Sequence, residues 1–179
     1  MKISPWLMKL ISLGAFQHEN GELKIFNTPV WLYPLDTSVV LYKTLVDKLG
    51  QKEVAKIFFD LGKQQSLFGL NQQLKVFGFK KNFKFLKASM DQPKTLGYGN
   101  LEIIKADFKK KHLVFRCLNT PFARKYKELY GKQEFPVDDF ILGSCAGCYE
   151  FFFGEGYNAR EVQCIGKGDN LCVFEIKIS

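Results

Sequence analysis

Two cysteines and a glutamate near the end of the chain have a spacing that suits a metal ion. Cys164 and Cys172 are equally far from Gly168 in the sequence, and residues 166–170 are all of turn-forming types. If that segment is a hairpin turn, the two cysteines face each other with Cβ atoms about 4.5–5.5 Å apart. Glu161 precedes Cys164 by three residues, so it must lie at a strand entrance or beside a bulge to reach the same ion. Zinc fits such thiolate and carboxylate ligands best, and a pair of buried free thiols is the alternative.

A helix is predicted to precede this hairpin, over about residues 137–154. Its apolar residues recur at three- and four-residue steps and share one face: Val137, Ile141, Cys145, Cys148 and Phe152. Cys145 and Cys148 form a Cys-x-x-Cys pair with both sulfurs on that face, which is compatible with redox or metal chemistry. No βαβ pattern surrounds the pair, so two small buried core residues are the simpler interpretation.

Small residues mark another face of this helix. Gly143 and Gly147 lie there, with Phe140 and Phe151 beside them, and a neighbouring backbone can come close to such a face. We expect a homodimer, formed through this face or another.

The sequence resembles the 4-vinyl reductase domain family. The family's metal-binding signature is similar to Glu161-x-x-Cys164 followed by seven residues and Cys172. Gly97-Tyr98-Gly99 before a strand, and Asn-Thr-Pro-Phe-Ala at residues 119–123, are similar to two further family motifs. The resemblance covers most of the chain and is best supported over residues 97–178. The family includes effector-binding domains of phenol- and toluene-sensing bacterial activators and stand-alone archaeal proteins. It implies a buried pocket for a small, largely apolar ligand.

One position departs from the family pattern. In the metal-binding phenol sensors another cysteine precedes the glutamate, and counting back through Gly143 and Gly154 places that position at Asp138. The implied zinc ligands are therefore Asp138, Glu161, Cys164 and Cys172. A carboxylate can bind zinc, although replacing a thiolate by oxygen makes the site harder. Cys145 or Cys148 is the alternative ligand if the helix is rotated or shifted.

The elements around these residues predict one α+β domain spanning residues 1–179, with helices packed on an antiparallel sheet. Alternating residues predict a hairpin on either side of lysines 109–111, and residues 172–178 alternate in the same way. Thr120 and Pro121 start a helix that ends before Gly131. The resemblance implies the ligand-binding domain fold of nitric-oxide-signalling haem domains and Golgi-transport subunits.

The expected pocket lies between the main helix, the central strands and the helix that starts at Thr120. Its wall candidates are Phe115, Cys117, Phe122, Tyr149 and Phe152. The chain contains 18 phenylalanines, which suits an apolar cavity, and a densely packed aromatic core is the alternative.

Basic residues alternate with aromatic residues between Phe77 and Phe85. Such interleaving occurs on platforms for single-stranded nucleic acid, whereas an amphipathic segment with lysines outside and phenylalanines inside is the simpler interpretation. The net charge is +8, which suits either an anionic partner or solubility. No nucleic-acid-binding motif is present.

No segment reaches the roughly 18 apolar residues of a membrane span, and residues 1–6 do not resemble a secretory signal. Five cysteines without an export signal predict a reducing cytoplasm.

The sequence lacks a nucleophile elbow, a P-loop and a dinucleotide fingerprint, so we assign no catalytic residue. We expect a ligand-binding or sensor domain with structural zinc that acts through a regulatory partner or as a carrier. The alternatives are an enzyme that uses the metal as a Lewis acid and an assembly or tethering subunit.

Overall fold

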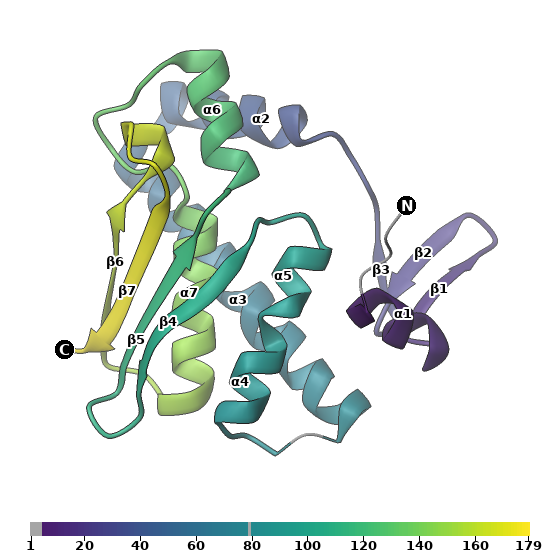
Figure 1. The fold of residues 1–179 in the computed structure, drawn as a ribbon. Helices are drawn as coiled ribbons and strands as arrows, with labels where there is room; N and C mark the ends of the chain where they lie inside the picture. The colour runs from purple at the N-terminus through teal and green to yellow at the C-terminus, as the bar shows by residue number, and fades with distance from the viewer. Residues whose placement is uncertain (1–4, 79) are drawn as a thin grey trace.

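An antiparallel sheet of four strands forms one layer of the molecule (Figure 1). The computed structural model describes residues 5–78 and 80–179. The strands are β4 (Leu101–Asp107), β5 (His112–Cys117), β6 (Tyr157–Gln163) and β7 (Cys172–Ile178), in the spatial order β4-β5-β7-β6. Alternate residues are fully buried along β5 and along β7 as far as Ile176: Leu113, Phe115, Cys117, Cys172, Phe174 and Ile176. This period of two places one face of the sheet on the core, and the predicted α+β fold is confirmed.

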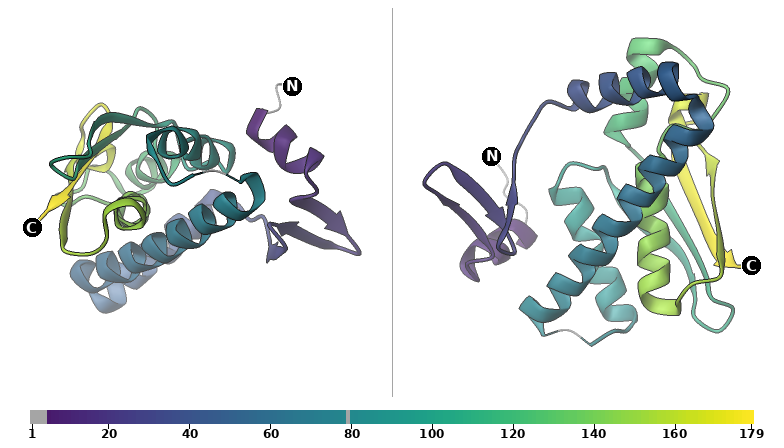
Figure 2. Two further views of the ribbon diagram at one scale, coloured as in Figure 1. Left: turned by 90° about the horizontal axis from the view of Figure 1, so that it is seen from below. Right: turned by 180° about the vertical axis from the view of Figure 1, so that it is seen from behind.

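Two long helices cover that face in successive layers (Figure 2). α7 (Asp139–Phe153) packs on the sheet, and α3 (Gln51–Phe77) packs on the outer side of α7. The helices approach so closely that a Cβ added at Gly143 would overlap the carbonyl oxygen of Phe59. Gly62 of α3 lies in the same way against the carbonyl oxygen of Phe140. Glycine permits these contacts because it has no side chain.

The glycine face of α7 is therefore filled by α3 of the same chain. A Cβ added at Gly147 would also lie against α3, at the carbonyl oxygen of Lys63. The sequence indicated that a backbone approaches this face, but the face is not available for the dimer contact considered above. The main helix expected over about residues 137–154 agrees with α7 to within two residues at each end.

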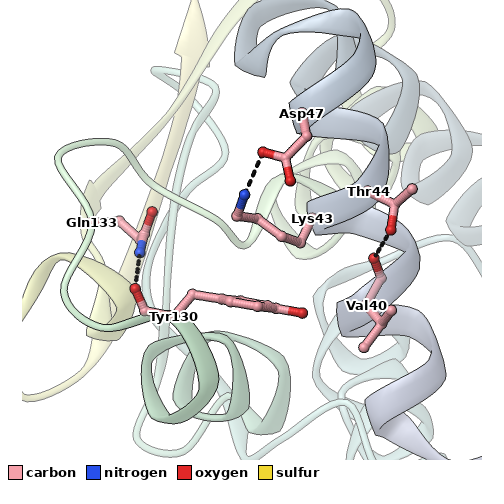
Figure 3. A network of polar contacts seen from close by, with 6 residues as sticks. All are labelled: Val40, Lys43, Thr44, Asp47, Tyr130 and Gln133. Carbon is pink, nitrogen blue, oxygen red and sulfur yellow. Dashed lines mark hydrogen bonds and ion pairs between the residues drawn. The ribbon is translucent and has the colours of Figure 1, made fainter.

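α2 (Leu35–Leu49) and α6 (Pro121–Tyr130) lie together beyond one end of the sheet (Figure 1). Figure 3 shows Lys43 of α2 directed at Asp47, with the ring of Tyr130 from α6 nearby. The Lys43 ammonium is 5.8 Å from the centre of that ring. Gln133 follows α6, and its side chain donates to the Tyr130 carbonyl at 3.0 Å. The backbone N–H of Gln133 donates to the carbonyl of Gly166 at 2.9 Å. These bonds fix the short 3₁₀ turn η1 (Ile165–Lys167), which directly follows Cys164.

The first part of the chain forms a small unit beside α3 and α5, on the far side of these helices from the main sheet (Figure 1). It contains α1 (Pro5–Ser12) and a three-stranded antiparallel sheet of β1 (Phe16–Glu19), β2 (Glu22–Ile25) and β3 (Thr28–Val30). Its buried residues are Leu10, Ala15 and Phe26, and the Phe26 ring meets that of Phe77 edge to face at 6.3 Å between centroids. The unit thus packs on the end of α3. The segment that leads from it to α2 leaves Trp31 83% and Leu32 87% exposed.

Two short helices, α4 (Phe83–Ser89) and α5 (Asp91–Thr95), connect α3 to the sheet. Phe85 is fully buried, as the amphipathic interpretation of residues 77–85 predicts, but Phe83 is 51% exposed. Phe79 lies outside the described residues. No helix in the described part of the chain combines the length and apolarity needed to cross a lipid bilayer.

Candidate metal centre and ligand cavity

Four side chains meet where the main helix begins and the last two strands adjoin. Asp138 is the N-cap residue of α7, Glu161 belongs to β6, Cys164 follows β6 and Cys172 begins β7. One ligand atom from each residue lies within 4.8 Å of the other three. Asp138 and the two cysteines are at most 1% exposed. The structure therefore brings together all four residues that the sequence implied as zinc ligands.

The strand register explains how Glu161 reaches this point. Glu161 is opposite Phe174, whereas Gln163 is opposite Val173, so the register of β6 shifts between them. This bulge turns Glu161 to the side of the sheet that Cys164 occupies, as the sequence analysis required. One step beyond the last paired residue of β6, Cys164 lies across from Cys172.

Hydrogen bonds hold the Cys172 sulfur in place. It donates to Oδ2 of Asp138 at 3.1 Å and accepts the backbone N–H of Ile165 at 3.2 Å. The hydroxyl of Thr120 is 3.3 Å from the same sulfur. Thr120 is the N-cap residue of α6, as the sequence predicted, but its side chain makes no capping hydrogen bond, and its hydroxyl instead faces the cluster.

Three oxygen atoms of the cluster lack a partner within the described protein. They are Oδ1 of Asp138 and both carboxyl oxygens of Glu161, all fully buried. Each buried polar atom without a hydrogen bond lowers the stability of the fold by about 1–3 kcal/mol. Three such atoms in one cluster therefore indicate that a binding partner is missing. An ion among two sulfurs and two carboxylates would give each carboxylate the partner that it lacks.

Burial also changes the acidity of the cluster. It raises the pKa of Glu161 to about 11, with the Asp138 charge adding to the effect. Burial likewise raises the pKa of Asp138 to about 7, with further repulsion from Cys164. A hydrogen bond from Cys172 lowers the pKa of Cys164 to about 5. Without a cation the group therefore keeps most of its protons, and a divalent cation would replace them.

A separate cavity of about 70 Å³ lies between α7, α3, the two short helices and the sheet. Its apolar lining includes Leu70, Met90, Leu96, Leu101, Phe115 and Ile141. Polar groups at its edge are mostly engaged elsewhere: the hydroxyl of Ser89 donates to the Leu86 carbonyl at 2.8 Å. The side chain of Gln65 donates to the hydroxyl of Tyr98 at 2.9 Å. Because Tyr98 accepts this bond, its own hydrogen can be donated to a ligand.

Cys145 and Cys148 both line this cavity and are 1% and 3% exposed. Burial raises the pKa of Cys148 to about 12 and that of Cys145 well above its usual value. Both thiols are therefore neutral near pH 7. They act as small apolar groups in the wall, which favours the packing interpretation over a redox pair.

Of the five wall candidates taken from the sequence, Phe115 lines this cavity. Cys117 is instead opposite Cys172 in the β5–β7 ladder, close to the metal ligands. Phe122 packs against Tyr42, with ring centroids 5.4 Å apart, and the remaining two, Tyr149 and Phe152, contact Phe153 and Phe85. The wall residues that the sequence did not indicate come from α3 and from the α4–α5 segment. The sequence feature that could have indicated these wall residues is a small polar residue at an otherwise apolar position, such as Ser66 or Ser89.

No family model matches the sequence. The uncharacterised protein MJ1460 of Methanocaldococcus jannaschii is 31% identical to it over 127 residues, which cover 69% of this chain and 74% of that protein. Among solved structures, the phenol-responsive sensory domain of the transcription activator PoxR, solved with phenol, superposes with a TM-score of 0.81. The two are 18% identical, and the match covers 99% of this chain and 92% of that domain.

Further solved structures share the fold at lower similarity. A vinyl-4-reductase family protein from Methanocaldococcus jannaschii gives a TM-score of 0.52 at 24% identity, over 95% of this chain and 94% of that one. A trafficking protein particle complex subunit 3 from Naegleria fowleri gives 0.54 at 13% identity, over 81% and 95% of the two chains. An H-NOX family structure gives 0.50 at 20% identity, over 96% and 83%. These matches confirm the fold relationship expected from the sequence.

Proposed function

Since the chain belongs to the 4-vinyl reductase domain family, we propose that it is a sensor or carrier domain for a small, largely apolar molecule. The observation that carries this proposal is the cavity beside α7, lined mainly by apolar side chains from α3, α7, the α4–α5 segment and the sheet. The PoxR sensory domain, which has the same fold, was solved with phenol. Phenol belongs to the ligand class that this lining suits, because it is mostly apolar and carries one polar group.

The size of the cavity limits how such a ligand fits. Its volume of about 70 Å³ is smaller than the roughly 150 Å³ of an engineered cavity that binds benzene. An aromatic ligand therefore requires part of the wall to move. Met90 is suited to this, because a methionine side chain is unbranched and adapts its shape at low cost.

Filling the cavity should weaken ligand binding without unfolding the protein. We expect Cys148→Met, which adds two heavy atoms beside the empty space, to bind phenol and toluene at least about tenfold more weakly than the wild type. Cys148→Ala enlarges the same cavity and should bind at least as well as the wild type. Titration calorimetry with the two compounds measures both effects. Equal binding by all three proteins would place the ligand elsewhere, and no binding of either compound by the wild type would contradict the proposed ligand class.

We further propose that Asp138, Glu161, Cys164 and Cys172 hold a zinc ion. Two thiolates and two carboxylates supply the four ligands of a tetrahedral zinc site. No coordination position then remains for a substrate, so the arrangement supports a structural ion over the Lewis-acid enzyme considered above. Such an ion would tie the start of α7 to β6 and β7.

We also propose that the chain acts in the cytoplasm and signals through a regulatory protein partner. All five cysteines are buried free thiols, which supports a reducing compartment. Such a partner would transmit ligand binding to the cellular response.

A homodimer should form through the segment that precedes α2. Trp31 and Leu32 are 83% and 87% exposed, and Val40 and Leu41 on α2 are about half exposed. Because large apolar side chains in such numbers are typical of an interface, we expect sedimentation to show a dimer at tens of micromolar. Trp31→Ser combined with Leu32→Ser should weaken the dimer at least about tenfold. Leu129→Ser, at a 44% exposed position of α6, is the control; a wild-type monomer would contradict the proposal.

A further inference from the structure

One end of the molecule carries a group of lysines that the proposed function does not use. It is the lower end in Figure 1, where the β4–β5 hairpin tip, the start of α4 and the end of α7 come together. We call this surface the basic end. Its exposed lysines are Lys80, Lys81, Lys84, Lys87, Lys109, Lys110 and Lys111. It lies away from the candidate metal centre, which is at the opposite end of the sheet.

An aromatic pair lies within the basic end. Phe83 is 51% exposed and Phe108 is 38% exposed, and their rings meet edge to face with centroids 6.0 Å apart. Phe108 also contacts Phe152 and Phe153 at the end of α7, with centroids 6.2 and 5.0 Å away. These contacts join the hairpin tip to α4 and α7, so the lysines on the two segments form one surface.

The positive charge of this surface is largely uncompensated. None of its seven lysines forms an ion pair with another described residue. The carboxylates in its chain segments are Asp107, Glu150 and Glu155, and Glu150 forms an ion pair with Lys63 of α3. Asp107 is engaged by the backbone N–H groups of Lys109 and Lys110, at 3.1 and 2.9 Å. Seven lysines against three carboxylates supply about half of the chain's net charge of +8.

We propose that the basic end binds the surface of an anionic lipid membrane. Lysines near such a surface are attracted to its negative potential, and exposed phenylalanines can enter the boundary between headgroups and acyl chains. The order of residues supports this occupant, because lysines surround an exposed aromatic pair at the end of a hairpin and a helix.

Nucleic acid fits the same surface less well. Single strands bind where aromatic faces are free to stack on bases, whereas Phe83 and Phe108 pack against each other. Arginine, the preferred residue for bidentate phosphate contacts, is absent from the basic end: the three arginines of the chain are Arg116, Arg124 and Arg160, on β5, α6 and β6.

Vesicle co-sedimentation of the full chain tests the proposal. We expect binding to phosphatidylcholine vesicles that contain phosphatidylglycerol and little binding to phosphatidylcholine alone. Lys84→Gln with Lys110→Gln should weaken binding about fivefold per lysine, or about 25-fold together. Phe83→Ser should weaken it while leaving its dependence on salt unchanged. The matched control is Lys52→Gln with Lys56→Gln, which removes the same charge from exposed positions of α3 and should bind like the wild type.

Three results would overturn the proposal. The first is equal sedimentation with both kinds of vesicle. The second is an equal loss in the α3 control, which would mean that net charge alone is responsible. The third is fluorescence anisotropy showing that a single-stranded oligonucleotide binds the wild type more tightly than anionic vesicles do in the same buffer. Phenol binding, measured on the same variants, should remain unchanged, so failure here and failure of the proposed ligand function can be distinguished.

Discussion

Cys172→Ser should release zinc and lower the melting temperature by about 10 °C, since losing a structural metal costs several kcal/mol and each kcal/mol shifts a domain of this size by about 2–4 °C. The sulfur of Cys172 lies among all the other donors of the cluster. We expect close to one zinc per chain in wild-type protein purified without chelator, measured by plasma mass spectrometry, and far less in the variant. Cys145→Ser, in the cavity wall, should keep its zinc and show only a modest packing cost.

The pH dependence of stability provides a second measurement of the same site. Without metal, burial holds the pKa of Glu161 at about 11 and that of Asp138 at about 7, both above their ordinary values. At these two carboxyl groups the folded state binds more protons than the unfolded state, whereas at Cys164, whose pKa is lowered to about 5, it binds fewer. The two carboxyl groups outweigh the one thiol up to about pH 7, so stability falls as the pH rises from about 5 to about 7. With zinc the ligands must lose protons, so metal stabilisation grows with pH. The difference in melting temperature between zinc-loaded and chelator-treated protein should therefore widen from about pH 5 to about pH 8; a constant difference, or wild-type protein without zinc, would contradict the site.

Gly143→Ala should destabilise the fold by about 3 kcal/mol or more. The new methyl group would meet the carbonyl oxygen of Phe59, which is part of the α3 backbone and cannot rotate away like a side chain. In an exposed helix the same substitution gains about 1 kcal/mol, so the expected sign is opposite to that of helix propensity. Urea unfolding followed by circular dichroism measures the change.

Lys56→Ala, at an exposed position of α3, is the control for that experiment and should change stability by less than about 0.5 kcal/mol. If Gly143→Ala were as stable as the wild type, α3 and α7 would be farther apart than the structure shows.

Local spacing in the sequence was enough to predict that Glu161, Cys164 and Cys172 lie close together. Cys164 and Cys172 are close because a turn fixes its flanking positions, and Glu161 required a bulge that the register now shows. Asp138 could not be derived in this way, because its approach depends on how α7 packs against the hairpin, and only the family resemblance indicated it.

The cavity was harder to predict because periodicity identifies a buried face but not the element that covers it. Phe122 and Cys117 are both buried, yet one packs in an aromatic cluster with Tyr42 and the other is opposite Cys172. The same limit affected the glycine face of α7. Gly143 and Gly147 indicate a close backbone in either case, and the sequence does not say whether that backbone belongs to the same chain.

The glycine contacts between α3 and α7 determine which way a ligand can enter. Because Gly62 and Gly143 bring the two helices into close contact, we expect α3 and α7 to move together, and the hydrogen bonds between its strands hold the sheet. The remaining wall consists of α4 and α5, helices of seven and five residues, with Met90 between them at the cavity. We therefore expect a ligand to enter the cavity by displacing this short segment. The basic end begins at the opposite end of α4 from Met90, so the lipid contact and the ligand entry use the two ends of one helix.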